Sequence, residues 1–190
     1  MDVMSENILK LLNMQPDFLA DTVKKRRLGF GLCGYGAGAF AFTFFTNISS
    51  GCGIFSFIMQ TLMYFILFVF TGILFAALTQ MFLDLTAKTG NAPGLFALVG
   101  ISEFAKLLLI AGAMISAAAG GGVVVNGMIF TFVFFFQIVL LIYLAAKAYG
   151  MTPGAVFLSM TLTIMPSLFA AVILICAGIA ALIALIAGLA

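Results

Sequence analysis

The chain has 190 residues, of which 65% are hydrophobic and 7% are charged, and its mean hydropathy is +1.31. So little polar surface cannot enclose a water-soluble core, and the composition therefore predicts an all-α, polytopic integral membrane protein. The charge is concentrated in the first 27 residues, so the formal net charge of +2 says little about partners, and a nucleic-acid-binding surface is disfavoured. Histidine is absent and the three cysteines are widely spaced, which disfavours a zinc site, a disulfide framework and a histidine-based triad. We expect no cofactor and no metal.

Residues 1–27 hold most of the charge, and we interpret them as a cytoplasmic segment. Between Met1 and Met14, apolar residues recur on one helical face and charged residues on another, which predicts an amphipathic helix that Pro16 ends. Such a helix can lie on the membrane surface, dock against a partner or pack on the protein's own cytoplasmic loops. A basic cluster follows, which is typical of a membrane-surface and topology anchor. Its members are Lys24, Lys25, Arg26 and Arg27.

Five apolar stretches follow, each long enough to supply the roughly 20 residues that cross about 30 Å of hydrocarbon. They are Leu28–Ile48, Ile54–Leu83, Leu95–Ala118, Val123–Ala146 and Ala155–Ala190. We therefore expect residues 28–190 to form a single five-helix transmembrane bundle. The loop lysines Lys88 and Lys147 share one side with the basic cluster, which predicts a cytoplasmic N-terminus and an external C-terminus. The second and fifth stretches exceed the bilayer, so they must tilt, bend or project, and Pro166 is a natural kink site.

Two stripes of small residues predict close helix packing. In the first span, Gly34 and Gly38 form a GxxxG pair that allows another helix backbone to approach closely. The stripe in the last span consists of Ala177, Ala181, Ala184 and Gly188. The spacing leaves open whether these stripes face helices of the same chain or those of a second copy.

An internal echo suggests a duplication. The segment from Gly90 to Gly94 and the segment from Gly150 to Gly154 both read Gly-x-x-Pro-Gly, each preceded by a lysine. Glycine suits the left-handed cap of a helix, and proline suits the first turn of the next one. The echo predicts that residues 54–118 and 123–190 are parallel hairpin repeats related by an axis along the membrane normal. Convergence of two good turn sequences is the alternative.

Glu103 and Lys106 are ionisable groups placed well inside an otherwise apolar span. At i and i+3 they share a helix face, which predicts a mutually neutralised pair facing the bundle. Charge at this depth is costly, so the pair is also a candidate partner-binding or transport site. Three further residues complete the candidate intramembrane polar site: Gln80, Asp84 and Gln137.

The layout resembles the Yip1 domain family in its short prokaryotic form. The resemblance is carried by Gln15-Pro16-Asp17-Phe18, the basic cluster, the five spans, and a second span that ends at Asp84 before the turn at Thr89-Gly90. Ile101, Ser102 and Glu103 follow Gly100, where the family often has a tyrosine and then a proline. Eukaryotic relatives act in early secretory membranes, where they associate with prenylated small GTPases. The long cytoplasmic region that those relatives carry is missing here, so that role is not transferred. The resemblance implies a prokaryotic cytoplasmic membrane.

The resemblance implies a non-catalytic scaffold or adaptor that binds other membrane proteins, forms homo-oligomers or organises lipid. The alternative is a small permease or an ion or lipid pathway that uses Glu103 and Lys106. An enzyme is disfavoured because the chain has no histidine, no carboxylate pair at helical spacing, and no serine or cysteine with a recognisable base. The expected partners are the lipid bilayer and other membrane proteins, not nucleic acid.

Overall fold

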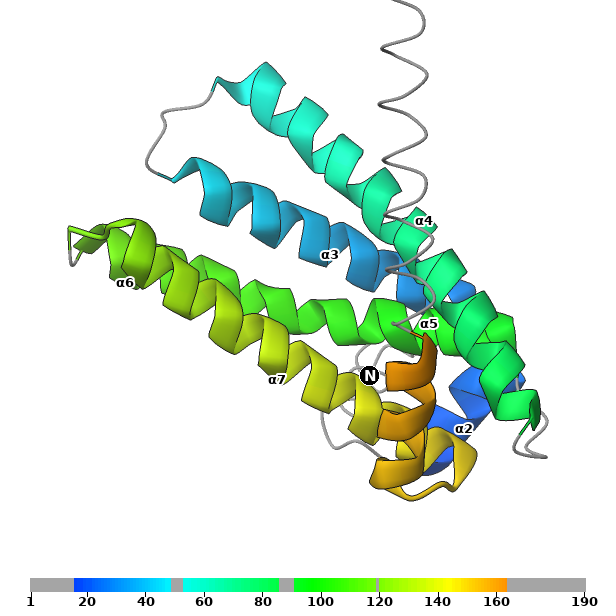
Figure 1. The fold of residues 1–190 in the computed structure, drawn as a ribbon. Coiled ribbons are helices and arrows are strands. Elements are labelled where there is room, and N and C mark those ends of the chain that lie inside the picture. The colour runs from blue at the N-terminus through cyan, green and yellow to red at the C-terminus, as the bar shows by residue number, and fades with distance from the viewer. Residues whose placement is uncertain (1–15, 49–52, 86–90, 119, 164–190) are drawn as a thin grey trace, which may run out of the picture.

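The computed structural model describes residues 16–48, 53–85, 91–118 and 120–163 (Figure 1). Every regular element in these ranges is a helix, so the described part of the chain has an all-α fold. Four of its helices are long and apolar enough to cross a membrane, which supports an integral membrane protein. The predicted amphipathic helix between Met1 and Met14 lies outside the described residues.

The predicted spans match the helix bounds closely. The four long helical stretches are α3 (Leu28–Asn47), α4 (Ile54–Leu85), α5 to α6 (Ala92–Ala118) and α7 (Val123–Tyr149). Each end lies within three residues of the predicted one. Of the predicted fifth span, the structure describes only the helix Pro153–Thr163. The rest of that span lies outside the described residues, including Pro166 and the stripe of Ala177, Ala181, Ala184 and Gly188.

The sequence pattern predicts one continuous α-helix for the third span, but the structure shows three segments. They are α5 (Ala92–Ser102), a 3₁₀ turn η1 (Glu103–Leu107) and α6 (Leu108–Ala118). Neither proline nor glycine occurs within η1, so no helix-breaking residue signals the change. In a 3₁₀ helix the side chains at i and i+3 eclipse one another. The turn therefore aligns Glu103 with Lys106.

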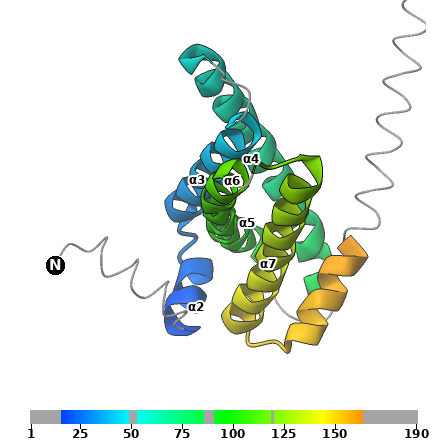
Figure 2. The same cartoon turned by 90° about the vertical axis from the view of Figure 1, so that its left-hand side faces the viewer.

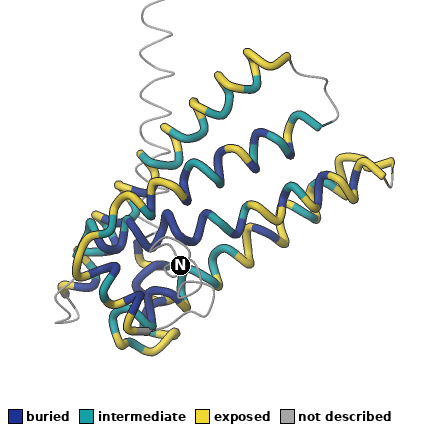
Figure 3. Tube along the Cα trace, turned by 180° about the vertical axis from the view of Figure 1, so that it is seen from behind, coloured by how far each residue is buried: buried dark blue, intermediate teal, exposed yellow. Residues whose placement is uncertain are grey.

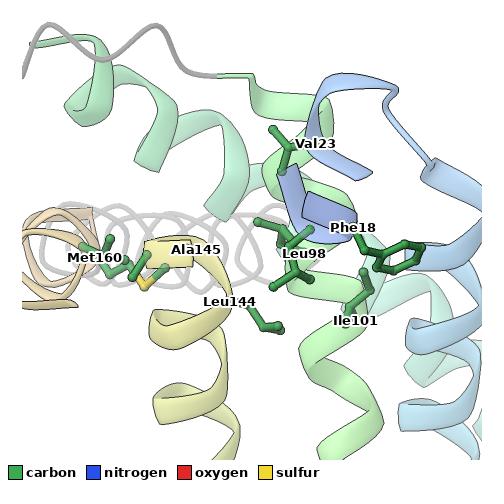
Figure 4. Packing of buried hydrophobic residues seen from close by; sticks show 10 residues of the cluster. Phe18, Val23, Leu98, Ile101, Leu144, Ala145 and Met160 are labelled. Carbon is green, nitrogen blue, oxygen red and sulfur yellow. The ribbon is translucent and has the colours of Figure 1, made fainter. Parts of the chain in front are cut away.

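A helix that the sequence analysis missed precedes the first span. This helix, α2 (Pro16–Lys24), begins at a proline, at a position where the missing N–H has no intrahelical partner to lose. Phe18, Leu19 and Val23 of α2 are buried in a cluster with residues of α5, α7 and the helix Pro153–Thr163 (Figure 4). The Asn91 side-chain amide donates to the Val23 carbonyl at 2.7 Å. α2 is therefore packed onto the ends of α5 and α7.

α3 lies inside the bundle. It packs against α4, α5, η1 and α6, while α7 packs against α5, η1 and α6. α4 and α7 do not pack on each other in the described part of the chain. Figure 2 shows α5 and α6 between α3 and α7. Figure 3 shows that buried residues concentrate on α3 and α5, whereas α4 and α7 are exposed over much of their length.

The turn after α7 has the predicted chemistry. Gly150 caps the helix in the left-handed conformation at φ 61°, and the Thr152 hydroxyl accepts from the Ala155 N–H at the start of the next helix. The corresponding cap before α5 is Asn91, whose side chain accepts from the Gly94 N–H. When Gly90 is aligned with Gly150, these two caps fall one position apart. Gly90 and residues 164–190 of the second hairpin lie outside the described residues, so the repeat stays a prediction.

Candidate functional site

The expected ion pair is present in the structure. The Lys106 Nζ atom lies 2.6 Å from Glu103 Oε2, and the two side chains are 12% and 8% exposed. On the other side of the carboxylate, the Gln137 amide of α7 donates to Glu103 Oε1 at 2.7 Å. Both carboxylate oxygens are therefore engaged. The structure brings together three of the five residues predicted for the polar site.

Two neighbours that the sequence analysis did not connect to the pair make its burial possible. Gly38 of α3 lies directly against Glu103, and a Cβ atom on Gly38 would be 2.7 Å from Glu103 Oε2. The Lys106 Nζ atom lies 3.5 Å from the centre of the Phe68 ring on α4, in a cation–π contact. The pair thus connects α3, α4 and α7 through η1. A GxxxG pattern signals Gly38 as a packing residue, but nothing in the spacing identifies Glu103 as its neighbour.

The glycine stripe of α3 packs within this chain. A Cβ atom on Gly34 would overlap the Gly100 carbonyl group of α5, and one on Gly31 would lie 2.8 Å from the Ala97 Cα atom. These contacts bring the backbones of α3 and α5 together, as small residues do in membrane helix pairs. We name this contact, formed by Gly31, Gly34, Gly38, Ala97 and Gly100, the glycine seam. The seam fixes the position of η1 and therefore of Glu103.

A cavity of about 480 Å³ lies beside the pair, between α4 and α7. Its walls come from α4, α5, η1, α7 and the helix Pro153–Thr163, and most lining side chains are apolar. Leu67, Phe134 and Phe157 also line it and are 51%, 48% and 56% exposed, so among the described helices the cavity opens onto the outer surface of the bundle. The buried Glu103 and Lys106 form its polar floor.

Gln80 and Asp84 do not belong to this site, which corrects the sequence-based grouping. The Gln80 amide donates to Asp84 Oδ1 at 2.9 Å, and neither residue lines the cavity. Both lie near the C-terminal end of α4, and Asp84 is exposed. Their i, i+4 spacing explains the hydrogen bond, because such residues are neighbours on a helix surface.

The basic cluster consists of the last residue of α2 and the turn that leads into α3. Lys24, Lys25 and Arg26 are exposed. Asp21 pairs with Lys25 at 2.9 Å and with Arg27 at 2.6 Å. One carboxylate thus offsets part of the positive charge that the sequence pattern assigned to the anchor.

The described residues contain no group of three His, Cys, Asp or Glu side chains that could hold a metal ion. Comparisons with family models, curated proteins and solved structures find no match to this chain. The resemblance to the Yip1 domain family therefore stays a prediction.

Proposed function

We propose that this protein is a non-catalytic membrane scaffold that organises lipid by holding an amphiphilic molecule in the cavity between α4 and α7. One observation carries the proposal: an apolar cavity opens onto the outer surface of the bundle and ends on a self-neutralised ion pair. Its volume of about 480 Å³ is within the ~300–1,000 Å³ that is typical of small-molecule sites. Apolar walls suit an acyl chain, and the floor suits a polar group.

The state of the floor favours binding over chemistry. Glu103 Oε2 is paired with the Lys106 ammonium and Oε1 accepts from the Gln137 amide, so both carboxylate oxygens are engaged by the protein itself. The Lys106 Nζ atom lies between Glu103 and the Phe68 ring, so it is already engaged by two groups of the protein. Residues that hold each other in this way can position a ligand without reacting with it.

The remaining parts of the proposal concern placement and partners. The exposed basic turn at Lys24, Lys25 and Arg26 suits the cytoplasmic headgroups of a prokaryotic inner membrane. That orientation places the N-terminus inside and the C-terminus outside. Besides lipid, other membrane proteins or a second copy are the partners that such a scaffold would bring together.

A photo-crosslinker placed in the cavity tests the proposal. The full chain is expressed with p-benzoylphenylalanine at Phe134, which lines the cavity, or at Phe132, which is 68% exposed and does not line it. After irradiation in membranes, mass spectrometry identifies the adducts. We expect one lipid species to be enriched at Phe134, whereas adducts at Phe132 follow the bulk lipid composition. The same lipid mixture at both positions would contradict the proposal, and a protein adduct specific to Phe134 would indicate a protein adaptor.

A pathway for a small polar molecule is the second candidate. It is favoured by η1, because a 3₁₀ stretch in the middle of a helix often marks a functional hinge, and here it carries both charged groups. In liposomes, a pathway would release an encapsulated solute faster with the wild type than with Glu103→Leu/Lys106→Leu. Equal release rates for both proteins would exclude this candidate for the solute tested.

A further inference from the structure

We infer that the cavity selects a neutral lipid with a hydroxyl or ester group, such as a monoacylglycerol, over lipids that carry a net charge. This inference rests on the proposed function and names the class of molecule held. It follows from the contacts that Glu103, Lys106 and Gln137 make with one another and from those that they leave open.

The first step is the charge of the floor. Lys106 and Glu103 form one ion pair 2.6 Å apart, and the other carboxylate oxygen accepts from Gln137 at 2.7 Å. The floor is therefore neutral as it stands. An anionic headgroup would have to draw Lys106 away from Glu103, and a cationic one would have to compete with Lys106. Either event leaves a charge without a partner in apolar surroundings, which is strongly unfavourable.

The second step is the hydrogen-bonding capacity that remains. An ammonium group has three N–H donors, and Lys106 directs its charge at Glu103 and the Phe68 ring. The amide oxygen of Gln137 is buried and accepts no hydrogen bond from the described residues. The floor thus has a spare donor in Lys106 and a spare acceptor in Gln137. A hydroxyl group supplies both an acceptor and a donor without bringing charge.

The third step concerns the walls. The other polar groups that line the cavity, the hydroxyls of Thr71 and Thr161, donate to the Leu67 and Phe157 carbonyls of their own helices. Their O–H groups therefore need no hydrogen-bond acceptor from a ligand. The remaining lining is dominated by Leu, Ile, Phe and Met side chains, which match a hydrocarbon chain. The ligand that fits has one apolar tail and one uncharged head group that contains oxygen.

Three photoreactive probes with the same diazirine-labelled acyl chain test this selection on the full chain in lipid nanodiscs. They are a monoacylglycerol, the corresponding fatty acid and the corresponding fatty amine. We expect the monoacylglycerol to label the lining peptides of α4 and α7 about tenfold more than either charged probe, a difference of about 1.4 kcal/mol in binding. Unlabelled monoacylglycerol should compete. Thr71→Trp or Leu67→Trp, which fill the cavity, should abolish the labelling, and Ile73→Trp on the outer face of α4 should not.

The outcomes separate this inference from the proposed function. If all three probes label equally and Thr71→Trp and Leu67→Trp still block them, lipid is held but the neutral class is wrong. If no probe shows labelling that the cavity-filling variants block, both ideas fail. Glu103→Gln adds a further test, because it leaves Lys106 without a counter-charge and should shift the preference to the fatty acid. An unchanged preference in that variant would overturn the charge argument.

Discussion

The helices of this bundle fall into an inner and an outer group that differ in burial. Within the eighteen-residue apolar core of each helix, 61% of the residues are buried in Ala92–Ala118 and 44% in α3, but only 22% in α7 and 11% in α4. The two outer helices, α4 and α7, are nevertheless the more hydrophobic ones. A water-soluble protein would bury its most hydrophobic helices, because apolar surface there is driven out of water. In this bundle, hydropathy does not decide which helix is inside.

The size of the side chains decides which helices lie inside the bundle. The inner helices meet through Gly31, Gly34 and Gly100, where any added Cβ atom would meet backbone of the facing helix. The outer helices present large side chains such as Ile66, Phe70 and Phe135 to the surroundings. Lipid tails are as apolar as leucine, so helices associate through close packing and polar contacts rather than by hiding hydrocarbon. Glu103 and Lys106 lie where the groups meet, with Gly38 on one side and Phe68 on the other.

The largest effect is expected from breaking this ion pair. Glu103→Gln or Lys106→Met leaves one uncompensated charge between the inner and outer helices, which should lower the free energy of unfolding by about 3–5 kcal/mol. Glu103→Leu combined with Lys106→Leu removes both charges and should restore most of the loss. A deficit of roughly 1 kcal/mol should remain, because the Gln137 amide loses its acceptor. Thermal unfolding in detergent measures all three variants.

The double variant is the control for this prediction. If the single variants are as stable as the wild type, both charged groups reach water and the pair is not buried. If the double variant is as unstable as the single ones, the loss comes from packing against Gly38 and Phe68 rather than from charge.

The second prediction concerns the glycine seam. Gly34→Ala places a methyl group on the Gly100 carbonyl, where both partners are backbone and cannot turn away. We expect a loss of about 1–3 kcal/mol, as for other overpacked sites. Gly36→Ala is the matched control, because it has the same chemistry two residues away in open space. It should be neutral or slightly stabilising, since alanine is a better helix former by about 1 kcal/mol. Equal melting temperatures for the two variants would show that the seam does not determine the packing of α3.

The sequence predicts where the long helices lie and which glycines pack closely, but it does not predict which helices face one another. Apolar length placed the four long helices, and the GxxxG pattern identified Gly34 and Gly38 as packing residues. The pattern left open whether they face this chain or another copy, because spacing does not specify the facing helix. For the same reason, polarity alone groups Gln80 and Asp84 with the ion pair. In the structure they bond to each other near the end of α4 and do not line the cavity.

Two local features escaped prediction for different physical reasons. The sequence pattern predicts no helix over Pro16–Lys24, although proline suits the first position of a helix and α2 begins there. The 3₁₀ turn at Glu103–Leu107 contains no glycine or proline. It coincides with the ion pair and with the Gly38 contact, so we infer that tertiary contacts rather than intrinsic propensity set it.

A third prediction compares one leucine from each group of helices. Leu98 of α5 is fully buried, whereas Leu74 of α4 is 48% exposed. In a membrane, Leu98→Ala loses packing but no hydrophobic transfer energy, so we expect a cost on the order of 1 kcal/mol rather than the ~2–5 kcal/mol of a soluble core. Leu74→Ala should cost less than about 0.5 kcal/mol, because lipid replaces the lost contact. Unfolding in bicelles measures both, and a Leu74→Ala loss equal to that of Leu98→Ala would mean that α4 is covered by protein.

The smallest effect is expected from an ion pair of the same length outside the four long apolar helices. The Arg27 Nη2 atom lies 2.6 Å from Asp21 Oδ2, the same distance as in the Lys106 pair, but the Arg27 and Asp21 side chains are 33% and 30% exposed, against 12% and 8% for Lys106 and Glu103. The hydrogen bond from Lys25, together with that from Arg27, lowers the pKa of Asp21 below its ordinary 3.8. The stabilisation from Asp21 is therefore complete above that ordinary pKa and is lost as the pH falls through the lowered pKa.

Melting temperatures of the wild type and Asp21→Asn, measured between about pH 7 and about pH 2, test whether the stabilisation from Asp21 is lost as the pH falls. The wild type should have a small advantage that is constant down to about pH 5 and disappears at the acid end. Salt should reduce the advantage, because the Debye length falls to ~3 Å at about 1 M. The Glu103 and Lys106 variants should show no such salt dependence, because that pair is shielded from solvent. An Asp21→Asn loss as large as that of Glu103→Gln would mean that burial is not what separates the two ion pairs.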